Sequence, residues 1–560
     1  MKKNNEDIKL EDFLEKKWHE DLENNPEFAT FLGVHTYNNK MNDHSEKAIL
    51  ESYQRELKVL EELEKINYQD LSENNKLNYD LFYLKTKNNI DSFKYEAHLM
   101  PINQMNGFNT YFARLIDMMP FKTEKDYENY LSRINFFNLI IEQLIDLMKK
   151  GMDKKLTVPK IAMKKVILQI KRQIPDDITQ SSFYKTLKKS ENISKELLNK
   201  IETSIKSEIY TGFNKLANFI EEVYLPACRD SIGISDLENG LELYNFLLKE
   251  LTTTDLTAEE IHNIGLKEVE RIFSEMNNIM KELGFNNYEK FLDYLRTNPD
   301  FYYNSPEMLL MSYRDFCKRV DKELPAFFKV LPRLPYGVEK VPDYQAPSAT
   351  SAYYMGASME MTRAGVFYVN TYKLETRAKY EKEVLALHEA VPGHHLQISL
   401  ALEMKDLPKF RKVSKFIGYV EGWGLYCEKL GEEMGFYQDL FSKFGRLVFE
   451  MRRACRLVID TGIHAFGWER EKAIDYLAYY TGKSKEHCEI DVDRYIVMPA
   501  QACTYKIGEI KILEIRKKFE ATLGKAFDIR DFHDIILRNG SLPLNILEKY
   551  AYKELEISKH

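Results

Sequence analysis

Residues 388–395 of the chain read His388-Glu389-Ala390-Val391-Pro392-Gly393-His394-His395, a His-Glu pair followed by two further histidines. Residues 420–428, further along, read Val-Glu-Gly-Trp-Gly-Leu-Tyr-Cys-Glu. Two imidazoles and one later carboxylate are the ligand set of a catalytic zinc ion that keeps its fourth position for water. A Glu beside the first His is then placed to activate that water. These residue types predict a zinc-dependent hydrolase, with a peptidase as the first choice.

The spacing of the histidines leaves the second ligand open. Zinc peptidases usually carry H-E-x-x-H, with both histidines on one helix face, but position 392 is Pro. On an unbroken helix His395, at i+7, returns to the face of His388, although it lies roughly 10 Å along the axis. Pro392 disrupts a helix and Gly393 adds backbone freedom, so a kink could instead bring His394 to the usual i+4 place. Both His394 and His395 remain candidates on spacing alone.

The motif resembles a known family at these residues. The bacterial domain-of-unknown-function family 885 (DUF885) has the hallmark H-E-x-x-P-G-H, which His388, Glu389, Pro392, Gly393 and His394 match. Four other stretches also resemble this family, at 363–370, 419–423, 456–464 and 499–508. The usual Arg-Pro-Gly of the family is Arg-Ala-Gly at 363–365, and its Pro-Gly-Gln is Pro-Ala-Gln at 499–501.

A more distant similarity suggests what the site does. The thimet-oligopeptidase, carboxypeptidase Taq and angiotensin-converting-enzyme families carry H-E-x-G-H, relative to which this chain has a two-residue insertion. The first two families also have a ligand Glu followed by another Glu seven residues later, a spacing that Glu421 and Glu428 reproduce. The resemblance implies one zinc ion per chain, held by His388, His394 and Glu421, with Glu389 as the general base. His395 becomes a side chain that supports the ligands or contacts substrate.

Further candidates have structural alternatives. Glu428 is a candidate ligand, but its position seven residues after Glu421 favours a role in orienting a ligating His. His464 lies at i+4 from Asp460 on an expected helix, so a structural Asp-His pair is as probable as a substrate contact. By resemblance to the Tyr-x-x-Gly stretch of carboxypeptidase Taq-like enzymes, Tyr505 is a candidate donor to the oxyanion. A packed aromatic ring is the alternative for Tyr505.

Several cations near the C-terminal motifs are candidates to hold a substrate carboxylate. They are Arg494, Lys506 and Arg456, and each would offset the cost of burying that charge. Tyr354 and Asn370, which end the stretches 351–354 and 363–370, complete the candidates for substrate contact or ligand support. C-terminal trimming and internal cleavage of short peptides both remain possible outcomes.

Composition excludes several functions. The chain has 560 residues, 44% hydrophobic and 30% charged, with a net charge of −7 from interspersed charges. This is typical of a soluble globular protein and argues against a basic nucleic-acid-binding stripe. The six scattered cysteines suit a reducing compartment. With no apolar leader and no run long enough to span a membrane, we expect a cytoplasmic protein with a short peptide as partner, and neither nucleic acid nor membrane. The oligomeric state stays open.

The fold class is mostly α. Amphipathic periodicity predicts helices over 47–65 and 124–150, and caps at Thr257 and Ser305 predict two helix starts. Strand signals occur only at 351–354 and 366–369. Four prolines within 331–350 indicate a loop between lobes, listed in order as Pro332, Pro335, Pro342 and Pro347. We therefore expect a two-lobed, metallopeptidase-like helical architecture with a deep cleft and a small sheet edge beside the metal helix, divided into an N-terminal lobe (1–335) and a catalytic lobe (336–560).

Two other functions remain compatible with the sequence. One is a metal-dependent amidase or hydrolase of a non-peptide substrate. The other is a non-enzymatic helical scaffold with a structural metal, against which the intact Glu389 argues, because a structural site needs no adjacent base. The sequence does not separate zinc from manganese or cobalt.

Overall fold

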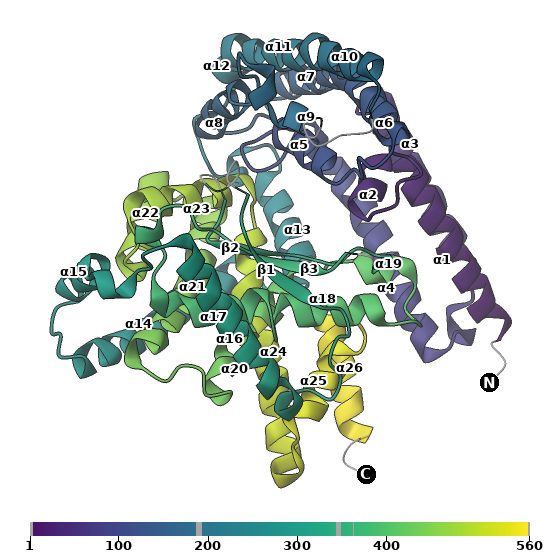
Figure 1. Ribbon diagram of the computed structural model, residues 1–560. Helices are drawn as coiled ribbons and strands as arrows, with labels where there is room; N and C mark the ends of the chain where they lie inside the picture. Colours follow the sequence, from purple (N-terminus) through teal and green to yellow (C-terminus); the bar gives the residue numbers. More distant parts are fainter. Residues whose placement is uncertain are drawn as a thin grey trace. The chain divides into compact units, whose positions relative to one another are not determined.

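The computed structural model describes residues 4–185, 187, 193–342, 346, 349–361 and 363–557. The chain is mostly helical with one small three-stranded sheet, as the sequence predicts (Figure 1). It divides into two compact units, Met1–Leu243 and Tyr244–His560. The boundary that we expected near residue 335 lies inside the second unit, and Pro347 lies outside the described residues. The deep cleft between lobes stays a prediction.

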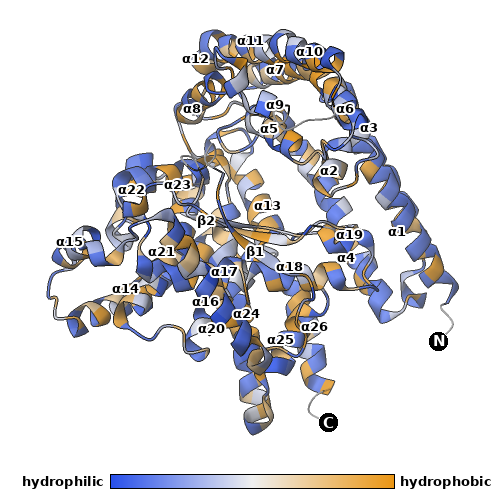
Figure 2. Ribbon diagram, in the orientation of Figure 1, coloured by the Kyte–Doolittle hydropathy of each residue, from blue (hydrophilic) through white to orange (hydrophobic). Residues whose placement is uncertain are grey.

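The first unit is made of helices whose apolar faces pack together. Orange and blue residues alternate along them in Figure 2, as expected of amphipathic helices. The predicted helix over 47–65 is α3, whereas the predicted helix over 124–150 is divided at Phe136 into α6 and α7. The helices are α1 (Asn5–Asn24), α2 (Pro26–Phe31), α3 (Glu46–Leu63), α4 (Glu73–Ser92), α5 (Phe108–Asp117), α6 (Glu124–Asn135), α7 (Phe137–Asp153), α8 (Lys160–Lys171), α9 (Ser182–Lys185), α10 (Lys195–Ser204), α11 (Thr211–Phe219) and α12 (Leu225–Ala227).

The second unit contains all the motifs. The boundary between the units falls within α13 (Gly240–Thr252). The remaining helices are α14 (Ala258–Glu282), α15 (Tyr288–Thr297), α16 (Pro306–Phe327), α17 (Lys382–Glu389), α18 (His394–Glu403), α19 (Lys409–Val413), α20 (Ile417–Glu433), α21 (Leu440–Phe466), α22 (Arg470–Thr481), α23 (Lys485–Val497), α24 (Thr504–Leu523), α25 (Ile529–Leu537) and α26 (Leu544–Ile557). Helix α14 packs along α21, and α20 along α24. The predicted caps are confirmed: Thr257 forms a capping box with Glu260, and Ser305 accepts from the Met308 N–H.

The sheet has the order β1-β3-β2. Its strands are β1 (Tyr336–Lys340), β2 (Ala352–Met355) and β3 (Gly365–Val369), with β1 parallel and β2 antiparallel to β3. Strands β2 and β3 confirm the two strand signals, but β1 lies in the stretch that we had expected to be a loop. Helix α16 packs against β1, α17 against β2 and α18 against β3, so the sheet lies beside the helices of the histidine motif (Figure 1).

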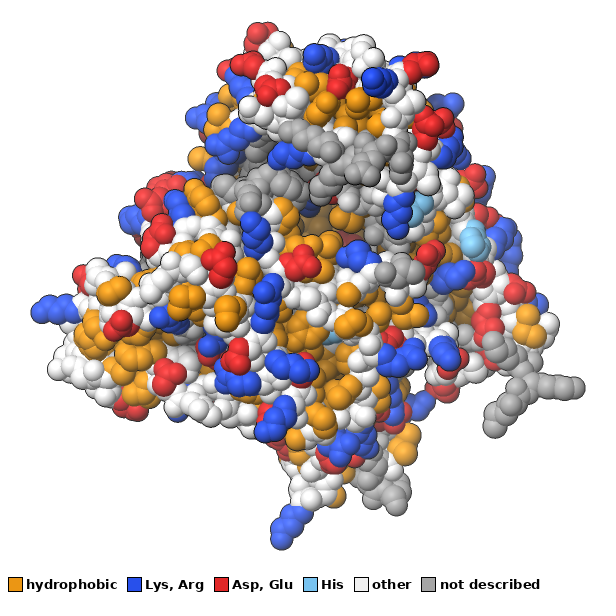
Figure 3. All heavy atoms as spheres, in the orientation of Figure 1, with side chains coloured by type: hydrophobic (Ala, Val, Ile, Leu, Met, Phe, Trp, Pro, Cys, Tyr) orange, Lys and Arg blue, Asp and Glu red, His pale blue; other side chains and the backbone are white. Residues whose placement is uncertain are grey.

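The surface and the cysteines agree with the composition. Acidic and basic side chains are interspersed over the face drawn in Figure 3. All six cysteines are buried free thiols. Among the described residues, the helices are too short or too polar to cross a membrane.

Candidate metal centre

The histidine motif is two helices joined by a tight turn. Helix α17 ends at Glu389 and α18 begins at His394, so the i+7 geometry of one continuous helix does not apply. The Val391–Pro392 peptide is cis. A Cβ added at Gly393 would lie 1.9 Å from the carbonyl oxygen of His388, so only glycine fits this approach. The Pro392 carbonyl accepts a hydrogen bond of 2.9 Å from Trp423 Nε1, which ties the turn to α20.

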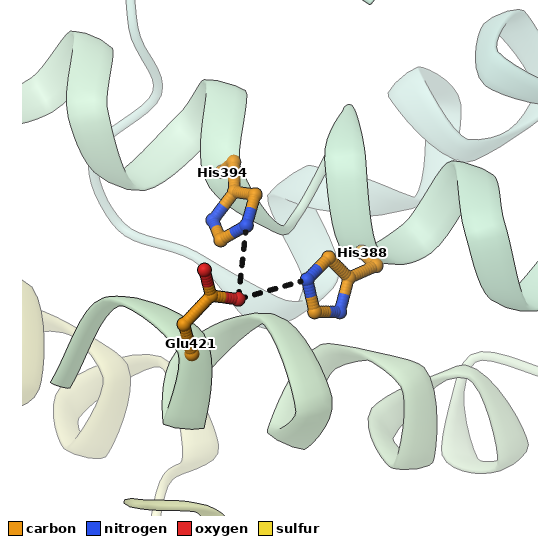
Figure 4. A group of neighbouring side chains, drawn as sticks. All are labelled: His388, His394 and Glu421. Carbon is orange, nitrogen blue, oxygen red and sulfur yellow. Dashed lines mark ion pairs between the residues drawn. The ribbon is translucent and has the colours of Figure 1, made fainter. Parts of the chain in front are cut away.

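The structure brings the three predicted ligands together (Figure 4). Glu421 Oε2 lies 3.4 Å from His388 Nε2 and 3.6 Å from His394 Nε2. Ligand atoms held about 2.0–2.1 Å from a tetrahedral zinc ion are about 3.3–3.4 Å apart. The donor set and its spacing therefore fit zinc, and the rings of the two histidines, inclined by 85°, both turn toward Glu421.

His395 belongs to a different environment. Its Nδ1 lies 2.9 Å from Tyr354 Oη and 3.2 Å from Ser399 Oγ, and its Nε2 lies 3.1 Å from the Leu334 carbonyl oxygen. Burial lowers the pKa of His395 to about 4, which keeps the ring neutral. Since both ring nitrogens have partners near the sheet, His395 and Tyr354 act as a structural link between α18 and β2, and the geometry favours His394 as the ligand.

Glycines in α20 allow the approach of Glu421. A Cβ at Gly424 would lie 2.6 Å from the ring of His388, and one at Gly422 would lie 2.5 Å from the backbone of Gly508 in α24. Helix α20 therefore fits between α17 and α24 only with glycine on both sides of Trp423. The Glu-Gly-Trp-Gly pattern is a packing signal that periodicity alone does not interpret.

A buried pair of charges supports His388. Glu428 Oε1 lies 2.7 Å from His388 Nδ1 and accepts a 3.0 Å hydrogen bond from Arg453 Nη2. Tyr437 donates to the Glu428 backbone carbonyl at 2.7 Å. Glu428 has the orienting position that the sequence predicts, whereas Arg453 and Tyr437 were missed, because nothing in their local sequence indicates which side chain they contact.

The electrostatics of the cluster favour a bound cation. Burial by itself would raise the pKa of Glu421, but the two histidines hold it well below its usual value. Burial by itself would lower the pKa of His388, but the carboxylates of Glu421 and Glu428 raise it to about 10. A proton on the His388 imidazole thus balances these carboxylates, and metal binding must displace it.

The proposed base and oxyanion donor lie on α17 and α24, which both pack against α20. Glu389 is the last residue of α17 and is partly exposed, and its side chain forms no hydrogen bond with the residues that the structure describes. Tyr505 lies in the first turn of α24, one turn before the Gly508 contact with α20. The Arg456 guanidinium stacks 4.5 Å from the Tyr505 ring centroid, and Gln501 Nε2 is 3.5 Å from its hydroxyl.

Other candidates have structural surroundings. Lys506 is buried among Glu450, Glu509 and Glu268, at 2.7, 2.6 and 3.0 Å, so its charge is already compensated and it is not placed to hold a substrate carboxylate. The fully buried amide of Asn370 donates to the backbone carbonyls of Ala346, Ala349 and Thr350, which argues against substrate contact.

His464 and Asp460 each have structural contacts with residues around the end of α23. His464 Nε2 lies 3.0 Å from the Tyr495 carbonyl oxygen. The Asp460 carboxylate accepts hydrogen bonds from Tyr244 Oη at 2.6 Å and from the Ala500 N–H at 2.9 Å. Burial raises the pKa of Asp460 to about 7. Both side chains therefore hold the segment that precedes α24.

Comparisons with known proteins identify the family of this chain. The model of the DUF885 family, described as bacterial protein of unknown function, matches residues 26–550, so the chain belongs to this family. No curated protein sequence matches it significantly. A crystal structure described as a "putative lipoprotein" from Colwellia psychrerythraea is similar at a TM-score of 0.92 and 25% identity, covering 98% of this chain and 99% of that one.

A second solved structure shares the fold. It is described as a "putative lipoprotein of unknown function" from Shewanella oneidensis, with a TM-score of 0.77 and 17% identity, covering 96% of this chain and 98% of that one. Both descriptions contradict the cytoplasmic location that we predicted, because a lipoprotein is anchored to a membrane by its lipid. The prediction relied on the lack of an apolar segment, which does not report on lipid anchoring.

Proposed function

We propose that this protein is a metal-dependent hydrolase that cleaves short peptides, with one zinc ion held by His388, His394 and Glu421. The observation that carries the proposal is the spacing of three buried or half-buried donor atoms, which matches a tetrahedral zinc site with one position left for water. The distant similarity to H-E-x-G-H peptidases supports peptides as the substrate class.

The chain supplies the remaining chemistry. A bound zinc ion would lower the pKa of its water toward neutrality and polarise the scissile carbonyl. Glu389, adjacent to the ligand His388 and free of other hydrogen bonds among the described residues, takes the proton of the attacking water and delivers it to the leaving amine. Tyr505, oriented by Arg456, donates a hydrogen bond to the oxyanion. Glu428 keeps Nε2 of His388 directed at Glu421.

The test combines metal analysis with a peptide digest. Purified protein should contain one zinc ion per chain and should cleave members of a library of unstructured peptides shorter than about 20 residues, as detected by mass spectrometry. Glu389→Gln should keep the metal and lose about two or more orders of magnitude in turnover, since it cannot accept a proton. Glu383→Gln, on the same helix, is the matched control and should keep both. Full metal loading without cleavage of any peptide would instead indicate a non-peptide substrate.

A further inference from the structure

Four arginines gather in the second unit close to the proposed metal centre. Helix α21 contributes Arg452, Arg453 and Arg456, and α23 contributes Arg494. Two tyrosine rings lie among them: Arg456 and Arg494 are 5.6 and 5.5 Å from the ring centroid of Tyr495, and Arg456 also stacks on Tyr505.

Only two of these arginines form ion pairs with carboxylates. Arg452 forms a two-pronged ion pair with Asp491 at 2.8 and 2.5 Å, and Arg453 pairs with Glu428. Neither Arg456 nor Arg494 has a carboxylate partner within the part of the chain that the structure describes. Arg456 Nε donates to Tyr495 Oη at 3.0 Å. Three of the other nitrogens are buried without a hydrogen-bond partner among the described residues: Arg456 Nη1, Arg494 Nε and Arg494 Nη2.

Two guanidinium groups beside one ring, Arg456 buried and Arg494 half-buried, are unfavourable when neither forms an ion pair. Removing such a charge from water costs several kcal/mol unless an opposite charge compensates it, and like charges beside the same ring repel each other. The residue Arg456 is only 4% exposed, so water contributes little to its solvation. An anion would relieve this cost, and the planar fork of a guanidinium matches both oxygens of a carboxylate.

Two sets of contacts link the region of Arg456 to the proposed metal centre. Arg453, one turn before Arg456 on α21, contacts Glu428, which contacts the ligand His388. Arg456 also stacks on Tyr505, the proposed oxyanion donor on α24. Arg494 is itself half-buried, so this part of the cluster is accessible to solvent.

We propose that Arg456 and Arg494 form a carboxylate-binding subsite that holds the free C-terminus of the peptide substrate. This inference rests on the proposed function, and it narrows that function to removal of residues from peptide C-termini. It also replaces Lys506, which forms ion pairs with three carboxylates, with two arginines that form no ion pair among the described residues.

The test compares one peptide with and without its terminal charge. Binding of N-acetyl-tetra-alanine and of its C-terminal amide is measured by calorimetry on zinc-loaded Glu389→Gln protein, in which turnover should be slower by about two or more orders of magnitude. A charge-assisted hydrogen bond contributes about 1.5–3 kcal/mol, so the free acid should bind about 10- to 150-fold more tightly than the amide. Arg494→Gln or Arg456→Gln, added to Glu389→Gln, should remove that preference by weakening the free acid alone, whereas the exposed Arg319→Gln should not.

Each outcome has one meaning. Equal affinity of acid and amide for the Glu389→Gln protein overturns the subsite, and this comparison needs no arginine variant to fold. If acid and amide bind equally and inorganic phosphate binds in a way that depends on Arg494, the cluster is a site for a free anion. This result also overturns the carboxylate-binding subsite. An acid preference that disappears in Arg494→Gln supports the subsite even if the wild-type protein hydrolyses no peptide, in which case only the proposed function fails. Arg494→Lys should keep part of the preference that Arg494→Gln loses, because lysine has the positive charge but not the planar, forked guanidinium.

Discussion

The most direct test of the metal centre's support is Glu428→Gln. This change keeps the shape of the side chain but removes its negative charge from between His388 Nδ1, at 2.7 Å, and Arg453 Nη2, at 3.0 Å. The amide oxygen can still accept one hydrogen bond, but it no longer increases the basicity of the imidazole or compensates the guanidinium. Loss of such a partner behind a ligating His lowers metal affinity about 10- to 100-fold, equivalent to about 1.4–2.8 kcal/mol.

The assay is competition for zinc against a chromophoric chelator. The wild-type protein and Glu428→Gln are titrated at the same pH, and the zinc affinity of each is calculated from the chelator signal. Glu433→Gln is the matched control, because Glu433 lies on the same helix, α20, but pairs with Arg516 near the surface. Unchanged affinity in folded Glu428→Gln would refute the orienting role. If Glu428→Gln instead loses zinc binding as completely as expected for His388→Ala, Glu428 is itself a ligand.

Three further predictions follow from the geometry. Elemental analysis should show that His394→Ala loses stoichiometric zinc and that His395→Ala keeps it. The reverse result would identify His395, at i+7, as the second ligand. In EDTA-treated protein the pKa of His388 is about 10, against about 6.5 in the unfolded chain. The stability that its protonation contributes should therefore be complete below about pH 6.5 and disappear toward pH 10, and a urea midpoint that does not fall over this range would contradict the assignment. Ala500 has a φ of 68°, a backbone conformation that costs an L-residue about 1–2 kcal/mol. After the entropy of glycine is subtracted, Ala500→Gly should raise the free energy of unfolding by about 0.5–1 kcal/mol. Unchanged or lower thermal stability of this variant would contradict the prediction.

Much of the helical framework could be predicted from the sequence, because it depends on local rules. The Thr257 capping box and the Ser305 cap require only neighbouring residues, and both are present. Strand β1 was missed because its five residues include Gly337 and two charged residues within a proline-rich stretch. The division of 124–150 at Phe136 was missed because the apolar periodicity continues through it.

The chemistry of the site could be predicted further than its geometry. His388, His394 and Glu421 were identified from residue types and family resemblance, and the structure brings them together. The contacts of Arg453 with Glu428, and the lack of ion pairs at Arg456 and Arg494 among the described residues, depend on how α21 and α23 pack. A sequence shows that an arginine is present but not whether a carboxylate meets it, which is why Lys506 and Arg494 looked equivalent.

The Pro-Gly of the motif has a structural role that differs from the chemical role of the histidines. Helical periodicity could not bring His394 to His388, since six residues of continuous helix point the two rings in different directions. The chain instead ends α17 and folds the turn back so that Gly393 lies against the carbonyl of His388, an approach that a Cβ at 1.9 Å would forbid. The backbone N–H of His395 then bonds to the Ala390 carbonyl at 3.0 Å, and α18 begins. His394 therefore reaches the ligand cluster only because position 393 lacks a side chain, which is the physical reason for a glycine directly before the second ligand in H-E-x-x-P-G-H.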